Sequence, residues 1–205
     1  MLKIAIQNKG RLSEGSIVFL KSLGLDFDPS GRMLITQCRN LDVSILYMRS
    51  SDITECVEMG VADFGIVGEN VLLEKSPNVK ILERLAFGEC ELVLAVPENS
   101  SYETVDDLSG RRIATSYPNA LSSYLKEKGV FSKVVFLNGS VEIAPALNLS
   151  DAICDLTQTG ITIRDNGLRI IDRVFKSQAV LIESPFYTEE KFKITNLINY
   201  GCLKC

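Results

Sequence analysis

Hydrophobic and polar positions along the chain follow two alternating patterns, and these patterns predict its secondary structure. Short runs of consecutive apolar residues, such as Leu-Val-Leu-Ala-Val at residues 92–96, are typical of strands that are buried on both faces. Between these runs, apolar residues recur every three or four positions, as at Ile17, Leu20 and Leu23, which indicates helices with one buried face. The predicted strands cover residues 2–7, 43–48, 63–68, 91–96, 111–116, 133–137 and 151–156, and the predicted helices begin near residues 13, 51, 119, 141 and 189.

Repeated strand–helix units predict an α/β fold with a parallel or mixed sheet that is covered on both faces. In such folds, ligands bind at the carboxyl ends of the strands. No glycine-rich linker divides the chain, but the extended segments 85–97 and 174–182 could cross between two lobes. We therefore expect one lobe from residues 1–88 and 178–205, a second from residues 89–177, and a ligand cleft between the two lobes.

The segment that is most informative about chemistry is residues 151–162, Asp-Ala-Ile-Cys-Asp-Leu-Thr-Gln-Thr-Gly-Ile-Thr. A phosphate group needs several N–H and O–H donors directed at one place, and a glycine lets the backbone approach it. The carboxylates of Asp151 and Asp155 suit sugar hydroxyls or a hydrated magnesium ion. A glycine after a strand more often only turns the chain, but this one joins a predicted strand to a predicted helix, the setting that a phosphate motif requires. The candidate phosphate-binding residues are Thr157, Gln158, Thr159, Gly160, Ile161 and Thr162.

Cationic side chains follow two other predicted strands. Lys9 and Arg11 flank Gly10 after the first strand, Arg49 directly follows strand 43–48, and Arg32 lies in a less defined position. Each of them is individually more typical of a solvated surface charge than of a ligand contact. Arginine is nevertheless the preferred side chain for bidentate phosphate contacts, so we keep all of them as candidates.

Two further loops complete the set of candidates. Gly68 ends a glycine-containing strand and could let a nucleotide approach the backbone, although such a glycine also suits a plain turn. Glu142 follows Asn138-Gly-Ser140 and offers a carboxylate, although acids are also common in the first turn of a helix.

Composition and charge exclude several classes of function. With 46% hydrophobic and 23% charged residues the chain is typical of folded globular proteins, and its net charge of −4 argues against a general affinity for nucleic acid. The chain has no histidine, which excludes Ser-His-Asp and Cys-His catalysis and histidine-ligated zinc. The six cysteines are scattered, so reduced thiols are favoured over a metal or redox role for Cys202 and Cys205. No secretory signal and no membrane-spanning run are visible, so we expect a cytoplasmic protein without a membrane partner.

Several blocks, in order and at consistent separations, resemble the catalytic subunit of ATP phosphoribosyltransferase, the enzyme of the first step of histidine biosynthesis. Acidic residues followed by Thr-Gly-x-Thr are also typical of enzymes that bind phosphoribosyl pyrophosphate (PRPP). The resemblance covers nearly the whole chain and rests on residues 6–12, 49–53, 60–70, 138–145, 151–155, 159–160 and 166–168.

The resemblance implies a two-lobed core similar to type II periplasmic binding proteins, and transfer of the phosphoribosyl group of PRPP to N1 of ATP with release of pyrophosphate. Magnesium would arrive with the substrate phosphates, without a metal site formed by the protein alone. The loop at residues 157–162 would hold the 5′-phosphate, and Asp151, Asp155 and Glu142 would face the ribose. The cations would contact pyrophosphate or ATP. The residues with a catalytic role would be Arg49, Arg11, Lys9 and Arg32. The residues that contact ATP would be Lys9, Gly10, Arg11, Arg49 and Gly68.

The resemblance is to the short form of the family, which lacks a C-terminal regulatory domain. It implies a hetero-oligomer with a regulatory subunit that resembles histidyl-tRNA synthetase, through which histidine would inhibit the enzyme. Two alternatives remain open from the residues alone. One is a salvage-type phosphoribosyltransferase that acts on a free base, and the other is a solute-binding module without catalytic activity.

Overall fold

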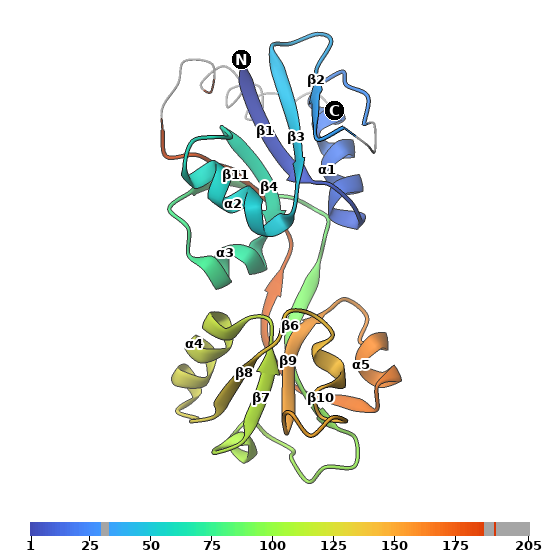
Figure 1. Cartoon of the computed structure of the whole chain (residues 1–205), viewed down its shortest axis with the longest axis vertical. Helices are drawn as coiled ribbons and strands as arrows, with labels where there is room; N and C mark the ends of the chain where they lie inside the picture. The colour runs from blue at the N-terminus through green and yellow to red at the C-terminus, as the bar shows by residue number, and fades with distance from the viewer. Residues whose placement is uncertain (30–32, 187–190, 192–205) are drawn as a thin grey trace. The chain divides into compact units, whose positions relative to one another are not determined.

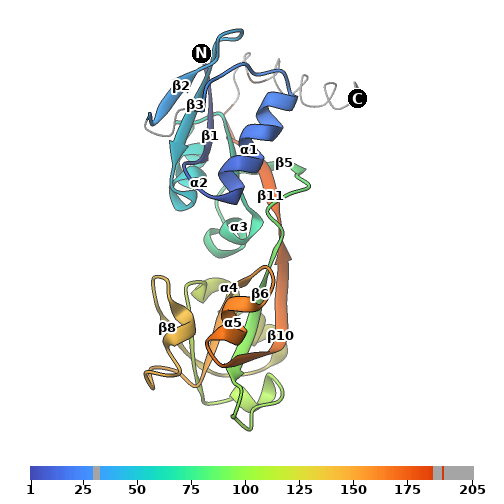
Figure 2. The same cartoon turned by 90° about the vertical axis from the view of Figure 1, so that its right-hand side faces the viewer.

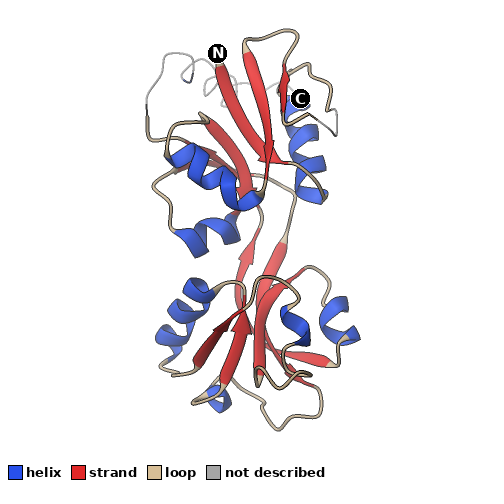
Figure 3. Cartoon of the chain, viewed as in Figure 1, coloured by secondary structure: helices blue, strands red, loops and turns tan. Residues whose placement is uncertain are grey.

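The computed structural model describes residues 1–29, 33–186 and 191, and these residues form two compact units, each with its own β-sheet (Figure 1). Unit 1 comprises residues 1–72, 76–88 and 178–205, and unit 2 comprises residues 73–75 and 89–177. Strands and helices alternate along the chain in both units (Figure 3), which confirms the predicted α/β class.

The sheet of unit 1 has six strands in the order β2-β3-β1-β4-β11-β5. β1 runs parallel to β3 and β4, whereas β2 and β11 are antiparallel to their neighbours. The strands are β1 (Leu2–Gln7), β2 (Ile35–Gln37), β3 (Val43–Met48), β4 (Phe64–Gly68), β5 (Lys80–Arg84) and β11 (Ala179–Glu183), and the helices are α1 (Arg11–Ser22), α2 (Ser50–Glu58) and α3 (Glu69–Lys75).

Alternating side chains of this sheet build two hydrophobic layers, because successive residues of a strand point to opposite faces. Ile4 and Ile45 face α1, whereas Ala5 and Leu46 face α2, so the two helices cover opposite faces (Figure 2). Full burial of one such aliphatic side chain stabilises the fold by about 1.5–3 kcal/mol. Gly65 lets α2 lie close to β4, since a Cβ there would come within 2.7 Å of Ile53.

The sheet of unit 2 has five strands in the order β10-β6-β9-β7-β8. β7 runs parallel to β8 and to β9, whereas β6 is antiparallel to β9 and β10. The strands are β6 (Cys90–Pro97), β7 (Arg112–Thr115), β8 (Lys133–Phe136), β9 (Ala152–Thr157) and β10 (Leu168–Ser177), and the other elements are α4 (Pro118–Lys128), α5 (Ile161–Asp165) and the short 3-10 turns η1 (Asp106–Leu108) and η2 (Val141–Ile143).

The described fold differs from the sequence predictions at β2, β5 and α3 and at the helix predicted from residue 141. β2 and β5 were not predicted, because one has only three residues and the other mixes charged and apolar positions. The helix predicted from residue 141 is a single 3-10 turn, since Pro145 provides no N–H to continue it. The helix predicted near residue 189, Arg32 and the pair Cys202 and Cys205 lie outside the described residues, apart from Lys191.

In the part of the chain that the structure describes, no helix has the length and apolar character needed to cross a membrane.

Candidate functional site

One edge of the unit 2 sheet gathers the loops that follow its parallel strands. Because β8 and β9 both run parallel to β7, the carboxyl ends of the three strands meet at this edge. The loops that leave them are residues 116–117 after β7, residues 137–140 after β8 and residues 158–160 after β9. Ligands of open α/β sheets bind at such an edge, so these loops form the candidate site of unit 2.

The predicted phosphate loop is a tight turn between β9 and α5. The hydroxyl of Thr157 accepts a hydrogen bond from the N–H of Gly160 at 2.8 Å, and the hydroxyl of Thr159 accepts one from the N–H of Ile161 at 3.4 Å. Gly160 has φ 73°, a left-handed conformation that costs other residues about 1–2 kcal/mol. The structure therefore brings the predicted residues from Thr157 to Thr162 together in one turn, with the side chains of Gln158, Thr159 and Thr162 exposed.

Two carboxylates lie beside this loop. Asp155 is half-buried on β9, and Glu142 is half-buried in η2, which follows the loop after β8. Burial raises the pKa of Asp155 to about 6, against the hydrogen bond from the N–H of Leu156, and the nearby charge of Glu142 raises it further. Asp155 is thus a carboxyl group that titrates close to neutral pH at the edge where a ligand would bind.

Asp151 is not part of this group. It precedes β9, whereas the loop follows it, and six residues of strand separate Asp151 from Thr157 by about 20 Å. Arg112 donates three hydrogen bonds to the Asp151 carboxylate, from Nε at 3.2 Å, from Nη2 at 3.1 Å and from its backbone N–H at 2.8 Å. This contact lowers the pKa of Asp151. Asp151 and Asp155 point to the same face of one strand, but lie about 13 Å apart along it.

Ser116 is a residue of this edge that the sequence reasoning did not select. Its hydroxyl donates to the carbonyl of Leu137 at 2.6 Å and accepts from the N–H of Gly139 at 3.2 Å. It therefore ties the end of β7 to the loop that leads to Glu142. The available signal was a polar residue at the end of the predicted strand 111–116, close to the signal that selected Arg49 directly after strand 43–48.

The predicted cationic residues gather at the corresponding edge of the unit 1 sheet. Lys9 and Gly10 follow β1, Arg11 opens α1, Arg49 precedes α2 directly after β3, and Gly68 ends β4. The N–H of Asn8 donates to the carbonyl of Met48 at 3.0 Å, which joins the loop after β1 to the end of β3. Because β1, β3 and β4 are parallel, their carboxyl ends meet here, as in unit 2.

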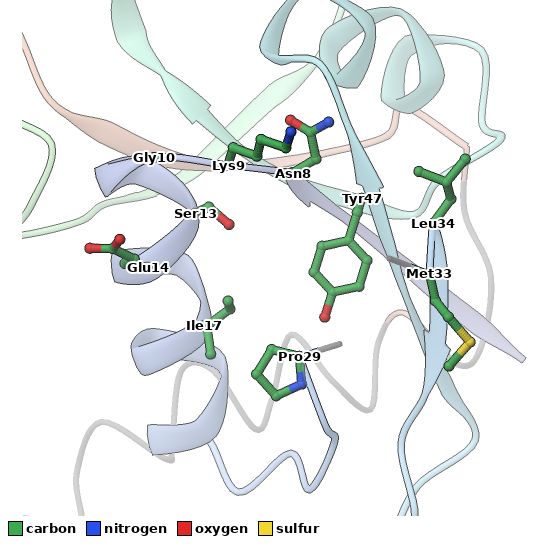
Figure 4. A pocket seen from close by; sticks show the side chains of 10 residues that line it. All are labelled: Asn8, Lys9, Gly10, Ser13, Glu14, Ile17, Pro29, Met33, Leu34 and Tyr47. Carbon is green, nitrogen blue, oxygen red and sulfur yellow. The ribbon is translucent and has the colours of Figure 1, made fainter. Parts of the chain in front are cut away.

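A pocket of about 510 Å³ opens beside this edge, between α1 and the β2–β3 pair (Figure 4). Lys9 and Gly10 are the only members of the predicted site that line it among the described residues. The pocket is lined by Asn8, Lys9, Gly10, Ser13, Glu14, Ile17, Pro29, Met33, Leu34 and Tyr47.

The carboxylates and thiols of the described residues form no ready-made metal centre. Within residues 1–29, 33–186 and 191, no group of three or more Cys, Asp or Glu side chains could hold a metal ion. Asp155 and Glu142 are a pair, which can bind Mg²⁺ only with oxygens from another source, such as phosphates and water.

Comparison with known proteins identifies relatives of this arrangement. A family model described as "HisG: ATP phosphoribosyltransferase" matches residues 49–200. An ATP phosphoribosyltransferase from Phocaeicola vulgatus is 40% identical over 196 residues, and the match covers 96% of this chain and 69% of that protein. One from Cytophaga hutchinsonii is 42% identical over 191 residues, with 93% and 67% covered. The chain thus spans about two thirds of the length of these curated relatives.

Solved structures agree with this result. The "ATP phosphoribosyl transferase (HisG:HisZ) complex from Thermotoga maritima" matches with a TM-score of 0.83 and 31% identity, over 99% of this chain and 98% of that chain. A periplasmic aliphatic sulphonate binding protein from Escherichia coli matches with a TM-score of 0.65 and 15% identity, over 98% and 69%, which shows a shared fold alone. The family model covers more than half of the chain, and the curated relatives are about 40% identical. The chain therefore belongs to the ATP phosphoribosyltransferase family.

Proposed function

We propose that this chain transfers the phosphoribosyl group of PRPP to N1 of ATP and releases pyrophosphate, the first step of histidine biosynthesis. The observation that carries this proposal is the family match, which includes the turn at residues 157–162 and the acidic pair beside it. We propose the cytoplasm as its location, because the chain belongs to a family of biosynthetic enzymes.

The edge of unit 2 would hold PRPP. In this assignment the backbone and hydroxyls of the turn at residues 157–162 bind the 5′-phosphate, and Asp155 and Glu142 accept hydrogen bonds from the ribose hydroxyls. We give Asp151 a structural role instead, because Arg112 already satisfies both of its carboxylate oxygens.

The edge of unit 1 would supply positive charge. During the reaction the bond between C1 of the ribose and the pyrophosphate oxygen breaks as the bond from N1 to C1 forms, and pyrophosphate leaves with the electron pair. N1 is a weak nucleophile, so stabilisation of the leaving group is the main task of the protein. Lys9, Arg11 and Arg49 are the described residues that we assign to it, and Arg32 joins them from the sequence alone.

Magnesium fits this arrangement as an ion that enters with the substrate phosphates. Mg²⁺ is often bound through one or two carboxylates together with phosphate oxygens and water, and Asp155 and Glu142 provide such a pair. When bound, the ion would neutralise charge on the departing pyrophosphate.

We also propose a regulatory partner. The matching Thermotoga chain belongs to a HisG:HisZ complex. By analogy, this chain would work in a hetero-oligomer with a HisZ-like subunit, which resembles histidyl-tRNA synthetase, and inhibition by histidine would pass through that subunit.

The proposed reaction is tested by pyrophosphate release from the purified protein, with ATP, PRPP and magnesium omitted in turn. We expect release only with all three, and a product with the mass of phosphoribosyl-ATP. Free adenine and orotate in place of ATP serve as controls for a salvage-type enzyme. If neither the chain alone nor the chain with a HisZ-like subunit releases pyrophosphate, the proposal is wrong and a binding module becomes the better explanation.

Replacing Ser116 with alanine should raise KM for PRPP about three- to tenfold and leave KM for ATP unchanged. The variant loses the hydrogen bonds that hold the loop before Glu142, each worth about 0.5–1.5 kcal/mol. Steady-state kinetics with each substrate varied in turn would measure the effect. Ser132→Ala is the matched control, because the Ser132 hydroxyl donates to the carbonyl of Leu108, and both residues precede the strands β8 and β7 at the opposite end of the sheet. Equal changes in both KM values would contradict a positioning role.

A further inference from the structure

A serine in the loop that leads to Glu142 has a left-handed backbone conformation. Ser140 has φ 46° and ψ 43°, and among the described residues other than glycine only Ser76 and Asn148 share a positive φ. This conformation is unfavourable for a residue with a side chain, because Cβ crowds the following carbonyl oxygen, whereas glycine adopts it freely. Residue 140 therefore carries a side chain at a position where glycine would be under less strain.

The surrounding structure imposes this conformation from both sides. Before Ser140, the N–H of Gly139 donates to the hydroxyl of Ser116 at 3.2 Å. After it, Val141 is fully buried in the hydrophobic layer that also contains Ile153. Strained backbone that neighbouring contacts impose is concentrated at functional sites, so the strain at Ser140 points to a function of its side chain.

The Ser140 hydroxyl contributes no contact to the fold that the structure describes. The side chain is exposed, and its hydroxyl makes no hydrogen bond within residues 1–29, 33–186 and 191, not even as a cap of η2. Serine and threonine hydroxyls in turns commonly bond to nearby backbone, as Thr157 does with the N–H of Gly160. The hydroxyl of Ser140 is therefore available to a ligand at this edge of the sheet.

Ser140 lies beside the carboxylates that we assign to the ribose. It ends the loop after β8 and precedes Glu142 by two residues, and the charge of Glu142 acts on Asp155 of β9. Ionised carboxylates only accept hydrogen bonds, whereas each ribose hydroxyl can accept one as well as donate one. Recognition of the sugar therefore needs a donor next to the carboxylates, and the Ser140 hydroxyl is such a donor.

We infer that the Ser140 hydroxyl donates a hydrogen bond to a ribose hydroxyl of PRPP, and that its strained backbone is kept because it presents the hydroxyl there. The inference rests on the proposed function and adds to it a residue that recognises the sugar. Ser140 and Glu142 would bind the ribose as a pair, in which the serine donates and the carboxylate accepts.

Calorimetry with PRPP and magnesium tests this assignment through Ser140→Ala, which removes the hydroxyl but keeps Cβ and therefore the backbone strain. We expect PRPP binding to weaken about three- to tenfold, the effect of one neutral hydrogen bond, and ATP binding to stay unchanged. Ribose 5-phosphate, which has the sugar but lacks pyrophosphate, should lose affinity by the same factor. Inorganic pyrophosphate, which has no sugar, should bind the variant as it binds the wild type.

Ser140→Gly separates this role from a structural one. It removes the hydroxyl and relieves the strain, so PRPP binding should weaken at least about threefold while the temperature of thermal unfolding stays the same or rises by up to about 4 °C. Ser76→Gly is the matched control, because Ser76 is also exposed, has φ 48° and lies in unit 1 at the end of α3. It should leave PRPP binding unchanged. A serine that only stabilised the loop would lose affinity and thermal stability together.

The outcomes separate this inference from the proposed function. If the wild type forms phosphoribosyl-ATP but both Ser140 variants bind PRPP within about twofold of it, less than one hydrogen bond contributes, the inference is overturned. If Ser140→Gly alone weakens binding, recognition by the hydroxyl is overturned. If Ser140→Ala weakens the binding of pyrophosphate instead of ribose 5-phosphate, the assignment to the sugar is overturned. If the wild type neither binds PRPP nor turns it over with a HisZ-like subunit, the proposed function fails and the inference fails with it.

Discussion

Replacing Thr159 with aspartate is expected to reduce the affinity for PRPP at least about 100-fold. The exposed turn at residues 157–162 would then place a carboxylate against the 5′-phosphate, and two like charges in contact cost several kcal/mol. Titration calorimetry with PRPP and magnesium would measure the effect. ATP binding, which we assign to unit 1, should not change.

Thr159→Asn is the matched control, because asparagine has nearly the same size as aspartate and lacks the charge. It should retain most of the PRPP affinity, since the side chain of Thr159 contributes only one long hydrogen bond, of 3.4 Å, to the turn. Equal losses in the two variants would mean that shape, not charge, accounts for the effect. Unchanged PRPP affinity in Thr159→Asp would remove this turn from the site.

Replacing Asp155 with asparagine should stabilise the free protein by about 2–3 kcal/mol at pH 8 and should not stabilise it at pH 4. The pKa of Asp155 is about 6 in the folded protein, against 3.8 as its ordinary value. Between these two values the unfolded chain releases a proton that the folded protein keeps, so stability falls as pH rises and the full penalty is present above pH 6. Asparagine carries no charge to bury and can still accept the hydrogen bond from Leu156. Urea unfolding at both pH values would measure this difference.

The same substitution should reduce activity, because we assign Asp155 to the ribose hydroxyls. In the wild type, kcat/KM for PRPP should fall on the acid side of an apparent pKa near 6, where the carboxylate becomes protonated. Glu142→Gln should move this apparent pKa to lower pH, since the charge of Glu142 contributes to raising it. A variant of Asp155 that is destabilised at pH 8 would show that its carboxylate stabilises the fold instead.

The fold class and the turn at residues 157–162 were accessible from the sequence for the same reason. Both depend on residues that are close together in the chain, whose periodicity or composition can be read directly. The sequence analysis was less informative about the surroundings of Asp151. Four residues along a helix bring two side chains together, whereas four residues along a strand separate them by about 13 Å. The predicted strand 151–156 therefore already separates Asp151 from the turn, and only its partner Arg112, 39 residues away, could not be read from the sequence.

The surroundings of Tyr47 and Ser116 could not be predicted because they come from distant segments. Tyr47 reads as one more apolar position of a buried strand, and the pocket that it lines is completed by Pro29, Met33 and Leu34, which precede β2. Ser116 gains its role from the carbonyl of Leu137, 21 residues later. Neither contact leaves a pattern in the local sequence.

The strand order of unit 1 also has a consequence for how the chain folds during synthesis. β11 lies between β4 and β5, so these two strands join one sheet only after residue 183 has been made. All five strands of unit 2, from residue 90 to residue 177, are translated before that point. Domains generally fold as units while the ribosome extends the chain. Unit 2 can therefore complete its sheet first, while the nascent unit 1 exposes the hydrophobic edge of β4 and needs protection from aggregation until β11 emerges.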